Sequence, residues 1–312
     1  MVMPGDSLVT VTFNPAVDKS TAVASMIPEK KLLCSNPVLE PGGGGINVAR
    51  AIKKLGGEAL AIYPAGGYNG QLLQRLLEKE GVASMPIPVK HDTRENLVVL
   101  DSGANLQYRF GMPGPEMEPN EWQQCLRAIE QVNNPGYIVA SGSLTTGVPK
   151  DIFAQMAVIA KRKNARLVVD TSGEALKAAL QEGIYMIKPN MGELAVLAGR
   201  EELDFEALPL VAKELIGQGR CQVIVVSMGP GGAMLITKDI TQYIAAPPVR
   251  RKSTIGAGDS MVGGIVLSLS KGKGLIESVK YGVACGSAAT INPGTALCRL
   301  EEVEKLYNMI CN

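Results

Sequence analysis

The sequence predicts an α/β fold with a mainly parallel central sheet flanked by helices, together with a small β-sheet lid. The first observation behind this prediction is that short apolar runs alternate with helix-patterned segments over most of the 312 residues. The second is that two glycine-rich turns each lead directly into a helix-patterned segment. Strands that alternate with helices favour a parallel sheet covered on both faces.

Six short apolar runs have the length and composition of buried strands. They span residues 8–13, 59–63, 137–141, 167–170, 185–188 and 223–227. Further segments have the apolar spacing of helices, namely 46–55, 71–80, 120–131, 150–163, 193–198, 205–218, 257–270, 275–290 and 301–309. Segments 233–236 and 241–245 predict an antiparallel hairpin. Ligands of such sheets bind beyond the carboxyl ends of the strands, so polar residues directly after strands are candidates for the site.

Two segments, 19–40 and 87–111, interrupt the alternation and have extended patterns. We expect them to form a lid on a single discontinuous unit. Its nucleotide-binding α/β body comprises about 1–17, 41–86 and 112–312, and its lid about 18–40 and 87–111. A sheet of exposed strands needs a cover, and a second copy of the chain supplies one. The pattern therefore predicts a homodimer formed through the lid.

Composition excludes several classes of function. A net charge of +1 and an aromatic content of 4% argue against a nucleic-acid partner. The chain has no apolar run of about 18 residues and no signal-peptide pattern at its start, so we expect no membrane association. Its six cysteines have no C-x-x-C spacing, which favours free thiols in a reducing cytoplasm.

The segment 253–264 is the most informative stretch, because a Gly-Ala-Gly turn leads into a small-residue helix. Gly256 and Gly258 allow backbone N–H groups to approach a ligand closely. The start of the helix carries unpaired N–H groups and a partial positive charge, which suit an anion. Asp259 lies in that first turn. A carboxylate base beside an anion site favours phosphate transfer to a hydroxyl over an ordinary loop before a helix.

The second glycine run covers residues 42–45 and precedes the predicted helix 46–55. Four consecutive glycines cost chain entropy, which favours a close approach of backbone to ligand over a hinge without ligand contacts. Asn47 follows in the first turn and can both donate to and accept from sugar hydroxyls.

Residues 42–50 and the later stretch 254–260 together resemble the two signatures of the ribokinase-like (PfkB-type) carbohydrate kinases. The resemblance covers nearly the whole chain and includes 108–114, 172–176 and 286–295. It implies a ribokinase-like fold, ATP as co-substrate, Mg²⁺ and a sugar-phosphate acceptor.

The resemblance assigns roles at the phosphoryl end of the site. Asp259 is expected to be the general base, with Gly256, Ala257 and Gly258 as the anion hole for the transferred group. Lys188 is expected to point to the nucleotide phosphates. The remaining expected contacts are Asn190 and Glu193 for Mg²⁺ and phosphates, partly through water, and Ser227, Gly229 and Gly232 under the nucleotide.

At the sugar end, the resemblance implies that Asp18 binds sugar hydroxyls and that Arg94 binds the phosphate of the sugar. An arginine suits a bidentate phosphate contact. Arg94 would serve its own site or, in a shared lid, that of the neighbour. The other expected substrate contacts are Gly43, Gly44, Asn47, Ser143 and, as an assisting cation, Lys31.

Ser253, Ile255, Ala289, Asn292 and Gly294 resemble a loop set that holds a monovalent cation, which implies potassium activation. The chain also departs from the family pattern in the lid. Ile27 stands in place of an aromatic residue and Leu33 in place of an arginine. These departures concern the strength of phosphosugar binding and regulation at the lid.

The function that these features predict is ATP-dependent phosphorylation of the 1-hydroxyl of fructose 6-phosphate, giving fructose 1,6-bisphosphate. Activity on tagatose 6-phosphate or fructose 1-phosphate is the alternative within the same class, because these sugars differ by one stereocentre or one phosphate position. A non-catalytic sugar-phosphate sensor on the same fold is the alternative from another class.

Overall fold

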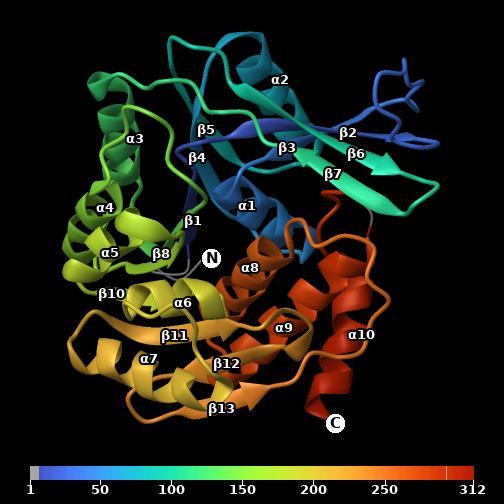
Figure 1. Ribbon diagram of the computed structural model, residues 1–312. Coiled ribbons are helices and arrows are strands. Elements are labelled where there is room, and N and C mark those ends of the chain that lie inside the picture. The colour runs from blue at the N-terminus through green and yellow to red at the C-terminus, as the bar shows by residue number, and fades with distance from the viewer. Residues whose placement is uncertain (1–6, 293) are drawn as a thin grey trace.

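The computed structural model describes residues 7–292 and 294–312. The first six residues of the predicted body and Pro293 therefore lie outside the described residues. A nine-stranded sheet, in the order β13-β12-β11-β10-β9-β8-β1-β4-β5, forms the centre of the body (Figure 1). Its strands are β1 (Ser7–Val11), β4 (Leu60–Ala65), β5 (Ser84–Pro88), β8 (Pro135–Ser141), β9 (Arg166–Asp170), β10 (Ile184–Ile187), β11 (Cys221–Ser227), β12 (Ala233–Ile236) and β13 (Thr241–Ile244).

The strands from β11 through β5 in this order pair in parallel, whereas β12 and β13 pair antiparallel at one edge. The prediction of a mainly parallel sheet and of the hairpin at 233–245 is thus confirmed. The strand β5 is an addition to the six strands and the hairpin that the sequence predicts. Its sequence Ser-Met-Pro-Ile-Pro contains two prolines, which a strand tolerates at a sheet edge.

Helices cover both faces of the sheet, and the sheet separates two apolar cores (Figure 1). One core contains residues of α1, α2, α8, α9 and α10, and the other contains residues of α3 to α7. The helices are α1 (Gly44–Lys54), α2 (Gly67–Lys79), α3 (Pro119–Gln131), α4 (Ile152–Arg162), α5 (Gly173–Gln181), α6 (Met191–Leu197), α7 (Leu208–Gly217), α8 (Ala257–Ser270), α9 (Leu275–Ile291) and α10 (Leu300–Cys311).

A second, four-stranded sheet projects from the body in the order β3-β2-β6-β7 (Figure 1). Its strands are β2 (Ala16–Val23), β3 (Val38–Gly42), β6 (Arg94–Asp101) and β7 (Leu106–Phe110). The antiparallel pair β6 and β7 lies within the segment 87–111, for which the sequence predicts an extended pattern. This sheet, which we call the lid, joins β2 and β6 in parallel.

The boundary between lid and body differs from the predicted one. Residues 87–88 belong to β5 of the body, because β5 pairs in parallel with β4. The lid strands β2 and β3 in turn extend into residues 16–17 and 41–42, which the sequence pattern places in the body. The change of sheet follows the turn at Asn14 and Pro15, where β1 has ended and β2 begins.

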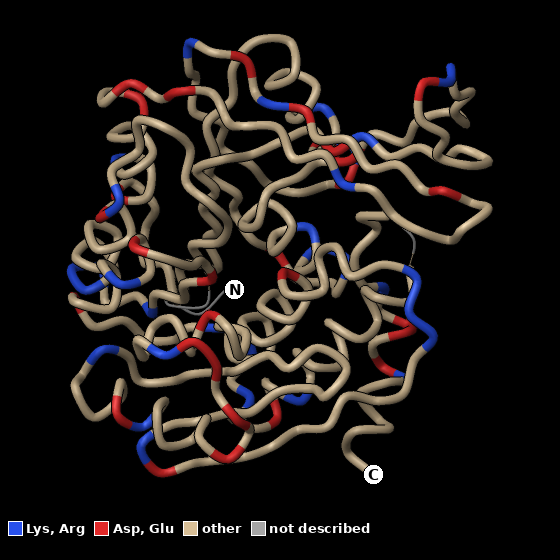
Figure 2. The backbone as a smooth tube through the Cα atoms, in the orientation of Figure 1, with Lys and Arg blue, Asp and Glu red and all other residues tan. Residues whose placement is uncertain are grey.

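Charge is distributed evenly over the molecule. Figure 2 shows Lys and Arg interspersed with Asp and Glu along both body and lid, in keeping with the net charge of +1. Among the described residues, no helix has the length and apolar character needed to cross a membrane.

Candidate active site

Two helix N-termini meet at the carboxyl ends of the central strands. The first turns of α1 and α8 are joined by a hydrogen bond of 3.0 Å from the amide nitrogen of Asn47 to Oδ2 of Asp259. The hydroxyl of Ser141, the last residue of β8, donates to the other carboxylate oxygen of Asp259 at 3.4 Å. The structure therefore brings together the two glycine-rich segments, although Asn47 and Asp259 are 212 residues apart in the chain.

The turn before α8 requires its first glycine. Gly256, the N-cap, has a φ of 71°, in the left-handed region. A Cβ on Gly256 would also lie 2.3 Å from Cδ2 of Leu297. The next residues, Ala257 and Gly258, begin the helix, so their N–H groups belong to the first turn, which has no intrahelical acceptors. This end of α8 can therefore hold negative charge on a ligand.

Asp259 is partly buried beside these N–H groups. The pKa of its carboxyl is raised from 3.8 to about 6, mainly because the group is removed from water and further because the charge of Asp170 is nearby. Hydrogen bonds from Asn47 and Ser141 and the charge of Lys188 act in the opposite direction. A carboxylate with a pKa near 6 is ionised at neutral pH but basic enough to take a proton from a hydroxyl.

A buried lysine lies on the opposite side of the same space. The Nζ atom of Lys188, just after β10, is 3.2 Å from Oδ1 of Asp170 at the end of β9. Burial alone lowers the pKa of Lys188, but Asp170, Asp259 and Glu193 together raise it above its ordinary value. A Cβ on Gly258 would lie 3.4 Å from this Nζ, so the lysine approaches the glycine turn directly.

Asn190 and Glu193 begin helix α6 as a reciprocal capping box. The side-chain oxygen of Asn190 accepts from the N–H of Glu193 at 2.8 Å, and Oε2 of Glu193 accepts from the N–H of Asn190 at 2.9 Å. Both side chains thus have a structural role besides the one expected for Mg²⁺. The described residues contain no cluster of three His, Cys, Asp or Glu that could hold a metal. A Mg²⁺ site does not require a cluster of this kind, because the ion commonly binds one or two carboxylates together with water and substrate phosphates.

A cleft of about 710 Å³ continues from the α8 turn. Ser227, Gly229 and Gly232 line one side, after strand β11, and Thr254, Ala257 and Gly258 line the other. Ser227 pairs with Asn190 through an isolated parallel bridge, which joins this side of the cleft to the start of α6. The cleft has the size of a small-molecule site.

The lid side of the site is built around Asp18 on β2. Its carboxylate accepts a hydrogen bond of 2.9 Å from Asn96 on β6, and burial raises its pKa. Gly42 on β3 lies close to the side chain of Asp18, because a Cβ on this glycine would lie 2.4 Å from Oδ2 of Asp18. A glycine is therefore required at position 42 to leave this carboxylate in place.

The α1 turn contacts the same side. Gly43 is the N-cap of α1 with a φ of 112°, and a Cβ on Gly44 would lie 2.4 Å from the hydroxyl oxygen of Ser141. Ser143 lies two residues after Ser141, in the loop that follows β8, and its hydroxyl accepts a hydrogen bond of 3.1 Å from the side-chain amide of Asn14. Gly44 thus approaches the end of β8, and Ser143 contacts Asn14 in the turn that follows β1.

Arg94 at the start of β6 lies next to Asp18, whose charge acts on it. Its guanidinium donates to three backbone carbonyls, those of Asn14 and Met112 at 2.9 Å and that of Pro15 at 3.4 Å. Arg94 therefore lies beside Asp18 of the same chain.

Three predicted lid residues lie apart from this group. Lys31, Ile27 and Leu33 are exposed and belong to the loop between β2 and β3, which projects beyond the lid sheet in Figure 1. The structure therefore does not bring Lys31 to Asp18 and Arg94.

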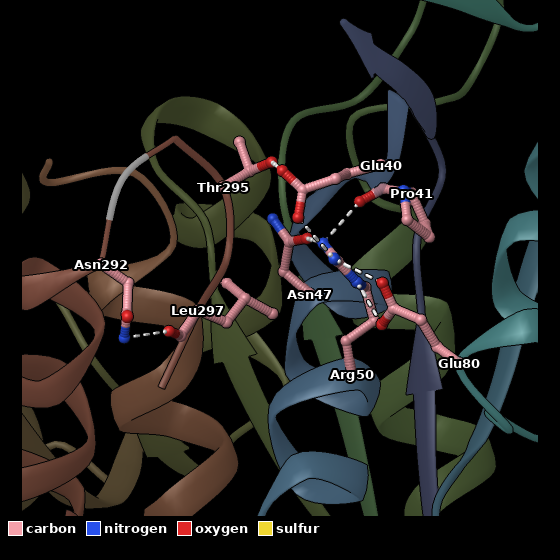
Figure 3. A network of polar contacts seen from close by, with 8 residues as sticks. All are labelled: Glu40, Pro41, Asn47, Arg50, Glu80, Asn292, Thr295 and Leu297. Carbon is pink, nitrogen blue, oxygen red and sulfur yellow. Dashed lines mark hydrogen bonds and ion pairs between the residues drawn. The ribbon is translucent and has the colours of Figure 1, made fainter. Parts of the chain in front are cut away.

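The five residues of the expected cation loop lie close together near the start of α8. The hydroxyl of Ser253 donates to the carbonyl of Gly294 at 2.9 Å and accepts from the N–H of Ile255 at 3.2 Å. The N–H of Asn292 donates to the carbonyl of Ala289 at 3.3 Å. The side-chain NH₂ group of Asn292 donates to the carbonyl of Leu297 at 3.0 Å (Figure 3) and to Oε2 of Glu302 at 2.8 Å.

The model of the pfkB family of carbohydrate kinases matches residues 8–302. The chain belongs to this family. Among curated relatives, the ATP-dependent 6-phosphofructokinase isozyme 2 of Escherichia coli strain K12 is 43% identical over 299 residues, covering 96% of this chain and 97% of the relative. The 1-phosphofructokinase of Xanthomonas campestris is 33% identical, covering 94% and 91%. The crystal structure of phosphofructokinase-2 from Escherichia coli in complex with potassium has a TM-score of 0.95 and 42% identity, covering 98% and 99%.

Several residues of this pfkB-family site were missed by sequence reasoning. Asp170 pairs with Lys188, and Asn96 binds Asp18. Asp170 could have been found, because it ends a buried apolar strand at the sheet edge where ligands bind. Asn96 could not, since the pairing of β2 with β6 joins segments 78 residues apart.

Proposed function

We propose that this pfkB-family chain is an ATP-dependent 6-phosphofructokinase that converts fructose 6-phosphate to fructose 1,6-bisphosphate in the cytoplasm. The observation that carries the proposal is the placement of Asp259. This carboxyl is partly buried, has a pKa of about 6, and lies in the first turn of the helix that follows the Gly-Ala-Gly turn. A base and an anion site are thereby held within one helical turn, as phosphate transfer to a hydroxyl requires.

In the proposed mechanism, Asp259 accepts the proton of the sugar's 1-hydroxyl as its oxygen attacks the γ-phosphorus of ATP in line. The bond between that phosphorus and the ADP oxygen breaks, and ADP leaves with the electron pair. The N–H groups of Gly256, Ala257 and Gly258 stabilise the negative charge on the transferred group. Lys188 neutralises charge on the nucleotide phosphates, and Asp170 keeps the lysine pointed at them.

The nucleotide is proposed to occupy the 710 Å³ cleft, with its ribose and base on Ser227, Gly229 and Gly232. Mg²⁺, which supplies charge neutralisation at the phosphates, would be held by Asn190 and Glu193 partly through water. A potassium ion would be held by backbone carbonyls of the loop formed by Ser253, Ile255, Ala289, Asn292 and Gly294. Replacing K⁺ by Na⁺ in the assay tests this last assignment, and equal rates in both salts contradict it.

The sugar is proposed to lie between the body and the lid. Asp18, Asn47, Gly43 and Gly44 would contact its hydroxyls, and Arg94 and Ser143 its 6-phosphate. The 43% identity to a 6-phosphofructokinase, against 33% to a 1-phosphofructokinase, supports fructose 6-phosphate as the acceptor.

The experiment that tests the function is an initial-rate assay with MgATP and three acceptors: fructose 6-phosphate, tagatose 6-phosphate and fructose 1-phosphate. We expect the highest kcat/KM for fructose 6-phosphate. A higher kcat/KM for tagatose 6-phosphate or fructose 1-phosphate would identify that sugar as the acceptor, with the same proposed mechanism. No turnover with any of the three acceptors contradicts the kinase proposal and favours the sugar-phosphate sensor.

We propose further that two copies of the chain associate through the lid. On the side of the lid that carries Asp18, Val38 is 56% exposed and Leu100 is 37% exposed. Val38 pairs with Ser20, and Leu100 with Ala22, so these side chains share one face. They border a hollow of about 550 Å³ between lid and body, which a partner can fill. Leu100→Glu is expected to convert dimers to monomers in sedimentation velocity, and monomeric wild-type protein contradicts the proposal.

A further inference from the structure

Arg50 on α1 is a fully buried arginine at the junction of body and lid. Figure 3 shows its guanidinium surrounded by acceptors. One nitrogen, Nη1, donates to the carbonyl of Pro41 at 2.8 Å and to Oδ1 of Asn47 at 3.2 Å. Nη2 donates to Glu40 at 3.2 Å and to Glu80 at 2.7 Å, and Nε donates to Glu80 at 2.9 Å. The five N–H bonds of a guanidinium thus each have a partner.

One of these hydrogen bonds determines which way the Asn47 amide points. A guanidinium has only donors, so the atom of Asn47 that faces Arg50 has to be the carbonyl oxygen. The NH₂ group of the same amide is then directed to the other side, where it donates to Oδ2 of Asp259 at 3.0 Å. Reversing the amide would place donor against donor at Arg50 and acceptor against carboxylate at Asp259.

The other partners of Arg50 anchor it to elements on either side of α1. Glu40 and Pro41 belong to the lid strand β3, and Glu40 also accepts from the hydroxyl of Thr295 in the loop before α10 (Figure 3). Glu80 is the C-cap of α2. The guanidinium is therefore fixed from the lid and the body at once, and its direction toward Asn47 is fixed with it.

We propose that Arg50 is the positioning residue of the base: it holds the Asn47 amide in the orientation that donates to Asp259, and joins that orientation to the lid strand β3. The inference rests on the proposed function, because Asp259 serves as a base only in phosphoryl transfer. Arg50 lies behind Asn47 and acts on the reaction through it.

The groups around Asp259 indicate how loss of this contact would be detected. Lys188 after β10, Ser141 at the end of β8 and Asn47 of α1 lower the pKa of the carboxyl, whereas Asp170 at the end of β9 raises it. Without a fixed donor at Asn47, one of the lowering contributions is lost. The carboxyl then keeps its proton to higher pH, and the base is available over a narrower range.

Arg50→Lys tests the proposal, because an ammonium has three donors and cannot satisfy five acceptors in the geometry of a planar fork. We expect kcat with fructose 6-phosphate and MgATP to fall on the order of 10- to 100-fold. The acid limb of the kcat/KM profile is expected to shift to higher pH, with the KM for ATP changing little. Ile129→Val, a buried change on α3, is the control for lost stability and is expected to leave the profile unmoved.

A double-mutant cycle separates positioning from general damage to the fold. If Arg50 acts through Asn47, then Arg50→Lys lowers kcat much less in an Asn47→Ala background than in the wild type. Should Arg50→Lys not fold, Glu80→Asp is measured in the same assays, because it shortens the carboxylate that anchors two guanidinium nitrogens. It is expected to cause a smaller shift in the same direction.

An unmoved pH profile in the folded variant, or additive effects in the cycle, overturns the positioning role even if kcat falls. Failure of the wild-type enzyme to phosphorylate any of the three sugar phosphates would instead overturn the proposed function. The two failures are therefore distinct.

Discussion

The body and the lid hold the charged residues of the candidate site in different ways. In the body, the buried Lys188 is paired with Asp170 at 3.2 Å and its charge also acts on Asp259, so charges are balanced against one another. In the lid, Asp18 accepts from the neutral amide of Asn96, and Arg94 donates to backbone carbonyls. The charges of Asp18 and Arg94 also act on each other, but each of the two residues hydrogen-bonds to neutral groups. In the proposed function, the body would therefore carry the chemistry and the lid would recognise the sugar phosphate.

The largest expected effect lies in the body. Asp259→Asn keeps the shape of the side chain but removes its basicity, so kcat should fall about 10²- to 10⁴-fold. Binding of fructose 6-phosphate and of ATP, measured by isothermal titration calorimetry, should change little. Unchanged turnover would contradict the assignment of Asp259 as the base and with it the division of labour between body and lid.

Arg94→Ala tests recognition at the lid. Loss of a charge-assisted phosphate contact should raise the KM for fructose 6-phosphate about 10- to 100-fold, because such hydrogen bonds contribute about 1.5–3 kcal/mol. The KM for ATP should stay within about threefold of wild type on the same scale. Arg127→Ala removes an exposed arginine from α3 and serves as the control. Equal changes in both KM values would remove Arg94 from the sugar site.

Gly42→Ala sharpens the same comparison with a single methyl group. The new Cβ would lie 2.4 to 2.6 Å from the carboxylate atoms of Asp18, which is a side-chain end that can turn aside. We expect an increase of about tenfold in the KM for fructose 6-phosphate, with little change in Tm. Gly111→Ala in the same lid meets no atom within 4 Å and should change neither quantity. A large fall in Tm for Gly42→Ala would show that the side chain of Asp18 cannot move away from the new methyl group.

The smallest expected effect is a change of conditions rather than of sequence. The pKa of Asp259 is raised to about 6, and the base has to be ionised to accept a proton. Activity should therefore be lost as pH falls through about 6, with kcat/KM at pH 5 about tenfold lower than at pH 7. The Asp259→Asn variant should lack this limb in its residual activity. A midpoint near 4 would place the carboxyl in a more polar setting than the structure gives it.

The body was more accessible to sequence reasoning than the lid. Buried strands such as β8 and β11 have continuous apolar runs, and the two glycine-rich turns identify the starts of α1 and α8. The lid depends on pairing between distant segments, such as β2 with β6, for which local patterns contain no information.

Missed features follow the same rule. Strand β5 escaped because its two prolines argue against a strand, whereas its place at the sheet edge permits them. The role of Arg50 escaped because a basic residue on a helix normally faces solvent, and only the fold brings Glu40 and Glu80 around it.

The burial of Asp259 also bears on the stability of the fold. A carboxyl whose pKa rises from 3.8 to about 6 on folding binds its proton more tightly in the folded state. The stabilisation that this proton provides is complete below pH 3.8 and is lost as pH rises through about 6. At neutral pH the ionised group lowers the free energy of unfolding by on the order of 3 kcal/mol. The ionised carboxyl of Asp259 is therefore expected to destabilise the folded chain over the pH range in which the proposed base is active. Asp259→Asn removes this charge and is expected to raise the free energy of unfolding at neutral pH.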